Sequence, residues 1–537
     1  MNDLHTVTQA ILAQEAELRD GGSEAGQKRQ RGLGRLTVRE RLGELLDPDD
    51  AFLEFGLWAA WRMYPEWGEV PAAGVVTGMG RIHGRPVCVV ANDATVKAGA
   101  FFPQSVKKVL RAQKIATLFR LPLVYLVDSA GVFLPLQDEI FPDEDDFGRI
   151  FRNNAVISAQ GIPQYAAVMG NCVAGGAYLP VLCDTLLMTE GSQMALAGAS
   201  LVKAAIGQTV DPEELGGAAM HAQISGTVDF REPDDASCLR RLRSLVELLD
   251  DDRKVQSPSE SGSAPGSAPA RHADDVFDLV PGDGQGEYEI RSVLECIVDA
   301  GSMQEYRAEF GLSLVTAFAK IAGHAVGIVA NQRHRSSSAT HELQIGGVLY
   351  PDSVEKAARF VMDCNQIGLP LVFFQDVQGF MVGRQSEQSG IIRAGAKLVS
   401  AVSNSVVPKF TVIIGGSFGA GNYALCGKAY DPWLILAWPS ARYAVMGANQ
   451  AAATLLDLRI RDAERKGAPL TKQQKEELHA EIRDKYEQQT DIRYGAARGW
   501  VDAIIQPNET RNWLAASLAV IPKGVSREGF RTGVFQV

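Results

Sequence analysis

Short apolar runs, separated by glycine turns and by stretches with helical spacing, occur twice along the chain in the same order. Residues 82–92 are typical of a strand, a tight turn at glycine and a second, buried strand, and residues 321–331 repeat that pattern. A helix is predicted to open at Ser105 in the first copy and at Ser353 in the second. Because several such blocks keep their order at nearly constant spacing, we infer that one unit has been duplicated.

The alternation of predicted strands and helices within each copy defines the fold class. It predicts an α/β protein of two duplicated domains, each a parallel sheet flanked by helices. Residues 256–272 begin with a stretch of serine, glycine and proline that cannot bury apolar surface, which indicates a flexible linker. We therefore expect an N-terminal domain over residues 1–255 and a C-terminal domain over residues 273–537. Residues 1–45 are expected to form a helical preface to the first copy.

Composition changes this picture only by excluding functions. The 537-residue chain carries a formal net charge of −11, which is unlike a surface that neutralises nucleic-acid phosphates. Its seven cysteines include no CxxC pair, so they suggest neither a zinc ribbon nor a disulfide framework and favour a reducing compartment. The first residues resemble neither a secretory leader nor a mitochondrial presequence, and no apolar run reaches the ~18 residues of a membrane span. We expect a cytoplasmic protein without a metal site.

Two glycine-containing turns recur in each copy and are the candidates for chemistry. The first turn follows an apolar strand at residues 127–131 and again at residues 375–379, and the second opens a helix at residues 174–178 and again at residues 419–423. Small residues let backbone N–H groups approach a ligand, and a helix N-terminus adds the positive end of its dipole. Two such turns facing each other would offer two N–H donors to one developing oxyanion, as enzymes do for an enolate.

Other interpretations of these turns stay open from the residues alone. The glycines could serve only close packing of helix on strand. Ser417 stands in the G-x-S-x-G pattern of serine hydrolases, but the one histidine downstream, His479, lies in a highly polar helix, and the first copy has Cys172 at the matching position. Residues 419–424 also fit the G-x-G-x-x-A pattern of a dinucleotide site, but no acidic residue follows at the distance that a ribose needs.

Longer motifs surround the turns. They lie at residues 133–139, 147–151 and 173–178 in the first copy and at residues 379–384 and 414–423 in the second. These motifs resemble the carboxyltransferase (β) subunits of biotin-dependent acyl-CoA carboxylases, within the crotonase superfamily, and the resemblance extends from about Arg31 to Val520. It is closest to the 3-methylcrotonyl-CoA carboxylase branch, which also carries a polar helical insertion like residues 461–489.

This resemblance implies duplicated crotonase-like domains with separate tasks, in which the first copy binds the acyl-CoA and the second binds biotin. The enzyme would move CO₂ from carboxybiotin to the enolate of the acyl-CoA. The implied oxyanion hole for the enolate consists of Gly131, Val132, Gly175 and Gly176, and the implied hole for the ureido oxygen of biotin consists of Gly379, Phe380, Ala420 and Gly421. The flanking residues expected to contact the two groups are Ala130, Phe133, Ala174, Lys203, Gly419, Asn422 and Tyr423.

The resemblance also implies partners. Biotin would remove the acyl proton itself, so no side-chain acid–base pair is needed. The chain carries no biotin-attachment or ATP-binding motif, which implies that the biotin carrier and the biotin carboxylase lie on a partner (α) subunit. The β subunits of this family form a hexamer of stacked trimers, without nucleic acid or membrane, and the 3-methylcrotonyl branch acts in leucine degradation.

Several positions depart from the pattern of that branch and leave the acyl group open. Residues 197–203 lack the usual glycine pair and prolines, residues 448–449 read Ala-Asn where glycine and glutamate are usual, and Phe101 and Phe102 replace tyrosines. Propionyl-, acetyl- or geranyl-CoA remain alternatives. A glutaconyl-CoA-type decarboxylase is another alternative, because the segment after Asn331 that ends at residues 345–347 resembles that enzyme. A noncatalytic assembly subunit is the last alternative.

The phosphates of CoA would require basic side chains near the first copy's opening. The available lysines there are Lys97, Lys107, Lys108 and Lys203.

Overall fold

The computed structural model of the protein describes residues 3–48, 50–141, 143–196, 202, 209–249, 266–282, 286–337, 343–465, 470–522 and 530–531. The chain divides into two compact units. The N-terminal unit comprises residues 13–261 and 497–499, and the C-terminal unit comprises residues 1–12, 262–496 and 500–537. Of the predicted linker, residues 256–265 lie outside the described residues, whereas in residues 266–272 the carbonyl of Ala268 accepts the N–H of Ala300.

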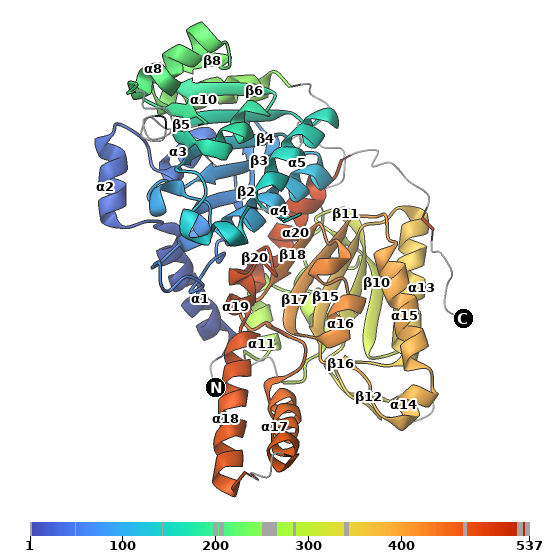
Figure 1. Cartoon of the computed structure of the whole chain (residues 1–537). Helices are drawn as coiled ribbons and strands as arrows, with labels where there is room; N and C mark the ends of the chain where they lie inside the picture. Colours follow the sequence, from blue (N-terminus) through green and yellow to red (C-terminus); the bar gives the residue numbers. More distant parts are fainter. Residues whose placement is uncertain are drawn as a thin grey trace. The chain divides into compact units, whose positions relative to one another are not determined.

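One mixed sheet forms the centre of the N-terminal unit (Figure 1). Its strands follow the order β1-β2-β3-β4-β5-β6-β8, with β7 beside β5. The first three strands pair antiparallel, and the pairs from β3 onward are parallel. The strands are β1 (Leu53–Phe55), β2 (Val75–Ile82), β3 (Arg85–Asn92), β4 (Leu123–Ser129), β5 (Gln164–Val173), β6 (Thr185–Thr189), β7 (Gln193–Ala195) and β8 (Phe230–Glu232).

The C-terminal unit repeats this sheet in the order β9-β10-β11-β15-β17-β18-β20, with β19 beside β17. The duplication and the α/β class predicted from the sequence are therefore confirmed, with each sheet mixed rather than wholly parallel because it starts with a hairpin. The strands of the sheet are β9 (Gln304–Glu305), β10 (Leu314–Ile321), β11 (His324–Asn331), β15 (Leu371–Val377), β17 (Lys409–Phe418), β18 (Leu434–Ala437), β19 (Arg442–Ala444) and β20 (Ala503–Ile504). Short pairs outside it are β12 (Ser336–Ser337) with β13 (Leu343–Gln344), and β14 (Val348–Leu349) with β16 (Gly379–Phe380).

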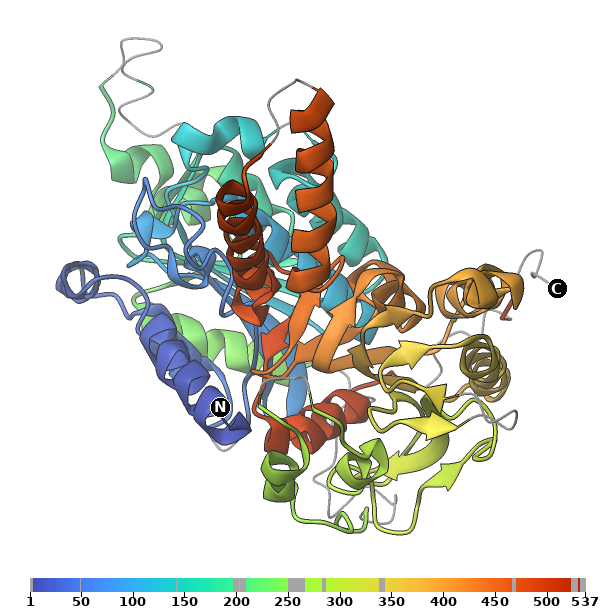
Figure 2. The same ribbon diagram turned by 90° about the horizontal axis from the view of Figure 1, so that it is seen from below.

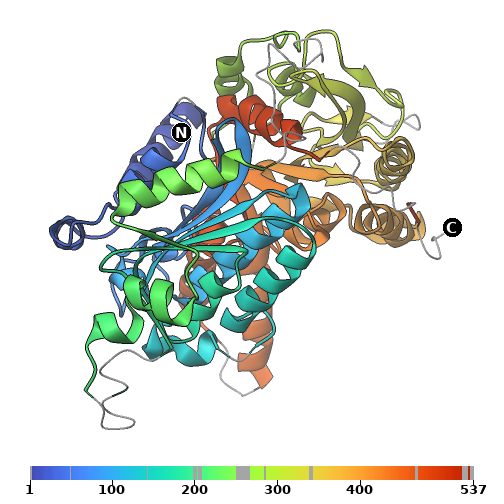
Figure 3. The ribbon, with the colours of Figure 1, turned by 90° about the horizontal axis from the view of Figure 1, so that it is seen from above.

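Helices cover both faces of the N-terminal sheet. Apolar side chains of α3 and α10 pack on one face, and Figure 3 shows α10 lying across the strands. Helix α4 lies on the opposite face, where Cys88 Sγ donates to the carbonyl of Ala112. Side chains alternate between the faces of a strand, so both faces are buried. The helices in the first half of the chain are α1 (Leu4–Arg19), of which residues 4–12 belong to the C-terminal unit, α2 (Glu24–Gly32), α3 (Val38–Leu45), α4 (Pro103–Phe119), α5 (Phe147–Ala159), α6 (Tyr178–Val181), α8 (Pro212–Gly216), α9 (Ala218–Met220) and α10 (Asp235–Glu247).

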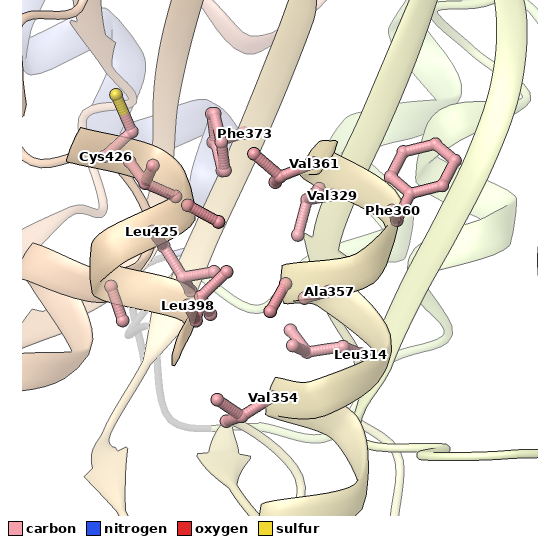
Figure 4. Close-up of a cluster of buried hydrophobic side chains, with 14 of the residues drawn as sticks. Leu314, Val329, Val354, Ala357, Phe360, Val361, Phe373, Leu398, Leu425 and Cys426 are labelled. Carbon is pink, nitrogen blue, oxygen red and sulfur yellow. The ribbon is translucent and has the colours of Figure 1, made fainter. Parts of the chain in front are cut away.

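In the C-terminal unit α13 and α15 cover one face of the sheet. Figure 4 shows Val361 of α13 beside Val329 and Phe373 of the strands, with Ala357 and Val354 further along the helix in the same buried cluster. Helices α17 and α18 form a pair that extends from the unit (Figures 1 and 2), so the predicted polar helical insertion is confirmed as helical. The helices are α11 (Val276–Leu279), α12 (Ile290–Leu294), α13 (Pro351–Ile367), α14 (Arg384–Gln388), α15 (Ile391–Ser403), α16 (Gly419–Ala424), α17 (Ala448–Arg465), α18 (Lys472–Thr490), α19 (Ile492–Ala497) and α20 (Thr510–Ala519).

The matched helices α4 and α13 begin in the same way. Each has proline in its first turn, and the backbone N–H just before that proline donates to a serine hydroxyl: to Ser105 Oγ at 2.9 Å in α4 and to Ser353 Oγ at 3.2 Å in α13. A proline fits there because its missing N–H would have no acceptor in the first turn. Within the described ranges, no helix has the length and apolar character needed to cross a membrane.

Candidate functional site

Each sheet loses regular pairing between the two strands that carry the predicted turns. In the N-terminal unit the register of β4 and β5 moves from Val127 opposite Val168 to Ser129 opposite Cys172. In the C-terminal unit the register of β15 and β17 moves from Gln375 to Val377 in the same manner. The second strand of each pair therefore bulges, and a bulge is a common way to redirect a chain next to a functional site.

A buried carboxylate fills the bulge of the N-terminal unit. Asp128 Oδ1 accepts the backbone N–H of Asn171 at 3.2 Å, while Oδ2 accepts Gln30 Nε2 at 2.9 Å and pairs with Arg41 Nη1 at 3.2 Å. Gly170 leaves room for it, because a Cβ on that glycine would lie 1.9 Å from Asp128 Oδ1. The carboxylate is thus surrounded by donors from three separate elements.

The C-terminal unit repeats the device. Asp376 Oδ1 accepts the N–H of Gly416 at 2.7 Å, and Oδ2 accepts the hydroxyl of Tyr288 at 2.9 Å and lies 3.2 Å from Arg333 Nε. A Cβ on Gly415 would lie 2.6 Å from this carboxylate. Burial raises the pKa of Asp376, and the Arg333 charge opposes that rise.

The first turn of the N-terminal unit follows Asp128. Gly131 has a φ of 89°, which a residue with a Cβ rarely adopts. Phe101 donates its N–H to the Gly131 carbonyl at 2.8 Å and accepts the N–H of Phe133 at 2.9 Å. Because neighbouring residues of an extended segment direct their N–H groups to opposite edges, the N–H of Val132 points away from Phe101. Ala130 beside it is exposed.

The matching turn of the C-terminal unit follows Asp376. Gly379 has a φ of 134° and pairs with Val348, and Phe380 pairs with Leu349. Met381 donates its N–H to the Leu349 carbonyl at 2.9 Å, as Phe133 does in the first copy. The N–H of Phe380 therefore points away from Leu349.

The second turns differ in how much room they leave. In the N-terminal unit β5 runs into the single helical turn Ala174–Ala177, which contains Gly175. Among the described residues beyond its chain neighbours, a Cβ on Gly176 would meet only the Phe147 ring, at 4.0 Å. In the C-terminal unit β17 runs into α16, which contains Ala420, and a Cβ on Gly421 would lie 2.5 Å from Val377 Cγ2. The N–H groups in a first helical turn have no acceptor within the helix.

Hydrogen bonds inside the C-terminal unit bear on the hydrolase interpretation. Ser417 is fully buried, its hydroxyl donates to Gln375 Oε1 at 2.6 Å, and it accepts Asn422 Nδ2 at 2.8 Å. The hydroxyl is therefore not presented to a substrate. Asn422 is buried as well, and the hydrogen bond of its side-chain amide to Ser417 fixes its orientation.

The remaining predicted residues lie around the turns. The rings of Tyr178 and Tyr423, at matching positions, are both 47% exposed, and Phe133 stacks on Phe102 with centroids 4.2 Å apart. Gly419 has a φ of 54° at the start of α16. Lys203 lies outside the described residues.

Lys108, one of the lysines considered for the CoA phosphates, is buried rather than at an opening. Its Nζ donates to the Ala72 carbonyl at 2.9 Å. Among the described residues, no cluster of histidine, cysteine, aspartate or glutamate side chains could hold a metal ion.

Comparison with known proteins identifies the class. The family model of the carboxyl transferase domain matches residues 29–528, so the chain belongs to that family. The predicted resemblance to carboxyltransferase (β) subunits of biotin-dependent acyl-CoA carboxylases is confirmed.

Individual relatives cover nearly the whole chain. The biotin-dependent 3-methylcrotonyl-coenzyme A carboxylase β1 subunit of Mycobacterium tuberculosis is 44% identical over 93% of this chain and 91% of its own length. The mitochondrial methylcrotonoyl-CoA carboxylase β chain of Arabidopsis thaliana is 41% identical over 96% of this chain and 86% of its own. The crystal structure of the P. aeruginosa geranyl-CoA carboxylase β subunit superposes with a TM-score of 0.84 at 33% identity and covers 100% of this chain and 98% of that one.

Sequence reasoning missed the charged residues beneath the turns. It assigned no role to Asp128 or Asp376, and it did not link Arg41 or Arg333 to them. A signal was present, since the two aspartates recur at matching positions of the two copies. The arginines gave no such signal, because they come from unmatched parts of the chain.

Proposed function

We propose that this chain is the carboxyltransferase subunit of a 3-methylcrotonyl-CoA carboxylase. The observation that carries the proposal is the 44% identity to the M. tuberculosis β1 subunit over nearly the full length of both chains. The likeness to the geranyl-CoA carboxylase β subunit agrees with it, because geranyl-CoA has the same 3-methyl-2-enoyl thioester at its reacting end.

In this proposal the N-terminal unit binds the acyl-CoA and stabilises its enolate. The backbone N–H groups of Val132 and Gly176 donate to the thioester oxygen, with Gly131 and Gly175 allowing the close approach. Ala130, Phe133, Ala174 and Lys203 remain the predicted contacts of the acyl-CoA. Each N–H donor of an oxyanion hole contributes about 3–4 kcal/mol to the transition state.

The C-terminal unit is proposed to bind biotin through the N–H groups of Phe380 and Gly421, with Gly379 and Ala420 completing the turn. The turn suits a ureido oxygen, because it offers backbone donors, and exposed apolar side chains at Val382, Tyr423 and Val445 suit the ring system. Gly419 and Asn422 remain predicted contacts on this side. Bound biotin would supply the carboxyl group and the base for the acyl proton, so this chain needs only to hold and orient both groups.

The proposal includes an assembly. A partner (α) subunit carries the biotin carboxylase and biotin carrier functions, and the β subunits form a hexamer of stacked trimers in the cytoplasm. The names of several relatives, which call them β chains or β subunits of carboxylases, support the partner subunit. The mass of the purified chain in solution, measured by light scattering, tests the hexamer directly.

The reaction can be tested with the purified chain in the reverse direction. Free biotin is offered with carboxylated 3-methylcrotonyl-CoA, and transfer of a labelled carboxyl group is followed. The carboxylated forms of geranyl-, propionyl- and acetyl-CoA, together with glutaconyl-CoA, serve as the panel of alternatives. The proposal expects the highest kcat/KM with carboxylated 3-methylcrotonyl-CoA. Higher values for another member would reassign the acyl group, and no turnover with any member, by a well-folded assembly, would refute the enzymatic role.

A further inference from the structure

The buried carboxylates stand at one defined place relative to the turns. Asp128 lies three residues before Gly131, and Asn171, which donates its N–H to that carboxylate, lies three residues before Ala174. One side chain thus ties together the two strands at equal distances from the two turns that they carry.

The C-terminal unit repeats this spacing. Asp376 lies three residues before Gly379, and its N–H donor Gly416 lies three residues before Gly419. The same tie therefore occurs in two units that hold different groups in the proposed function. Because both copies keep this hydrogen bond between the two strands, we infer that it meets a requirement common to both. In the proposed function each copy requires its two turns at a fixed separation.

We propose that Asp128 positions the acyl-CoA turns and that Asp376 independently positions the biotin turns. This inference rests on the proposed function. Neither carboxylate touches a substrate; each sets the separation of the two turns that its own strands carry.

A backbone carbonyl in each bulge also accepts a side-chain hydrogen bond. In the N-terminal unit Arg41 Nη2 donates to the Met169 carbonyl at 2.9 Å, while its charge faces Asp128. In the C-terminal unit the matching carbonyl, that of Ile414, accepts the hydroxyl of Ser440 at 2.9 Å. In each bulge the aspartate accepts a backbone N–H, and a separate donor binds a backbone carbonyl. Loss of the carboxylate charge should therefore weaken only the hydrogen bond to the N–H.

The negative charge of each aspartate is the property that an asparagine side chain cannot supply. An asparagine has the shape of aspartate, but it would turn an N–H₂ group toward the donors that now face the carboxylate. Hydrogen bonds to an ionised acceptor are about twice as strong as neutral ones. A displacement of about 1 Å in a positioned catalytic group can lower a rate by about 100-fold.

The first test is Asp128→Asn in the reverse assay with carboxylated 3-methylcrotonyl-CoA and free biotin. We expect kcat/KM for the acyl-CoA to fall about 10- to 100-fold, while the KM for biotin stays within about 2-fold. Circular dichroism and assembly mass serve as folding controls.

The matched test is Asp376→Asn, with the opposite selectivity. We expect kcat/KM for biotin to fall about 10- to 100-fold, while the KM for the acyl-CoA stays within about 2-fold. Each variant is the control for the other, because a merely structural role would lower the parameters of both substrates together.

Milder variants decide the matter if the asparagine variants do not fold. Gln30→Leu removes one donor to Asp128, and Tyr288→Phe removes one donor to Asp376, while both arginines stay. We expect the same selectivity at about 3- to 10-fold. Unchanged kinetics, or equal losses for both substrates in both variants, would overturn the inference. An inactive wild-type chain would instead refute the proposed function.

Discussion

Asp128 in the N-terminal unit and Asp376 in the C-terminal unit occupy matching positions in matching bulges. The arginines that neutralise them come from different parts of the chain. In the N-terminal unit the cation is Arg41 on α3, in the helical preface before the first copy. In the C-terminal unit it is Arg333, just after β11. The two arginines do not correspond in the repeat, although the two aspartates do.

The charge balance also differs. Arg41 faces two buried carboxylates, since its Nε lies 2.8 Å from Asp235 Oδ2. Arg333 faces the Asp376 carboxylate and also donates to the carbonyls of Gly346 and Gly286. The difference indicates that the position of the carboxylate was the constraint during divergence. The residue that neutralises the carboxylate could change, provided that some cationic donor stayed within hydrogen-bonding distance of it.

The largest effect should come from removing the cations, and it should be unequal. Arg41→Met leaves two buried carboxylates without their cation and is expected to lower the free energy of unfolding by about 3–5 kcal/mol. Arg333→Met should cost about 3 kcal/mol, because it removes the cation from one buried carboxylate, Asp376, and not from two. Urea unfolding of the two variants measures the difference.

The stability loss of Arg333→Met should also depend on pH. Burial raises the pKa of Asp376, so this carboxylate takes up a proton at a higher pH in the folded protein than in the unfolded chain. The penalty of a charged, unpaired Asp376 should therefore shrink as pH falls through that raised pKa, and Arg333→Met should regain stability relative to wild type. Equal losses for Arg41→Met and Arg333→Met, unchanged between pH ~5 and ~8, would contradict the distinction between the two units.

The next effect concerns the open second turn of the N-terminal unit. Gly176→Val places a side chain at a position where Gly176 has little packing: of the described residues beyond its chain neighbours, only the Phe147 ring comes within 4.0 Å of the added Cβ. The fold should therefore tolerate the change while the proposed thioester site is filled. We expect kcat/KM for the acyl-CoA to fall about 100-fold or more. Gly43→Val on α3 is the matched control, because that glycine is exposed and a Cβ there meets nothing. Similar rates for both variants would place the acyl site elsewhere.

Substituting alanine for glycine in the second turn of each unit should change the free energy of unfolding by different amounts. Gly421→Ala brings a Cβ within 2.5 Å of Val377 and should cost about 1–3 kcal/mol of unfolding free energy. Gly176→Ala should stay within about 0.5 kcal/mol of wild type. A valine at 421 is therefore a poor probe of function, since lost activity could come from lost packing. Equal urea midpoints for the two alanine variants would mean that the α16 turn yields more easily than its packing indicates.

The sequence was sufficient for the duplication, because blocks such as residues 82–92 and 321–331 repeat within one chain. It was also sufficient for the turns, since glycines such as Gly131 and Gly379 recur after matched strands and have the positive φ that favours glycine. Both inferences rest on local patterns of residues, which the fold keeps close to the backbone features that they specify.

The charged layer under the turns could not be read in the same way. Arg41 reaches Asp128 only through the packing of α3 on the sheet, and Tyr288 reaches Asp376 from a segment before its own copy of the hairpin. No spacing in the sequence encodes contacts of that kind. Lys108 shows the converse, because its residue type made it a candidate for the CoA phosphates, whereas it is buried in the structure.

The two copies should also differ in the pH window over which a buried lysine changes the stability of the fold. Lys108 on α4 and Lys356 on α13 occupy matching positions, and burial lowers the pKa of Lys108 from 10.5 to about 7 and that of Lys356 to about 8. A lysine with a lowered pKa in the folded state costs stability at low pH, and that cost disappears as pH rises from the folded pKa toward the unfolded value. Wild type should therefore gain thermal stability relative to Lys108→Met from about pH 7 upward, but relative to Lys356→Met only from about pH 8 and by less. Melting temperatures of the three proteins between pH ~6 and ~10 test this, and curves that stay parallel would mean that both lysines are already solvated.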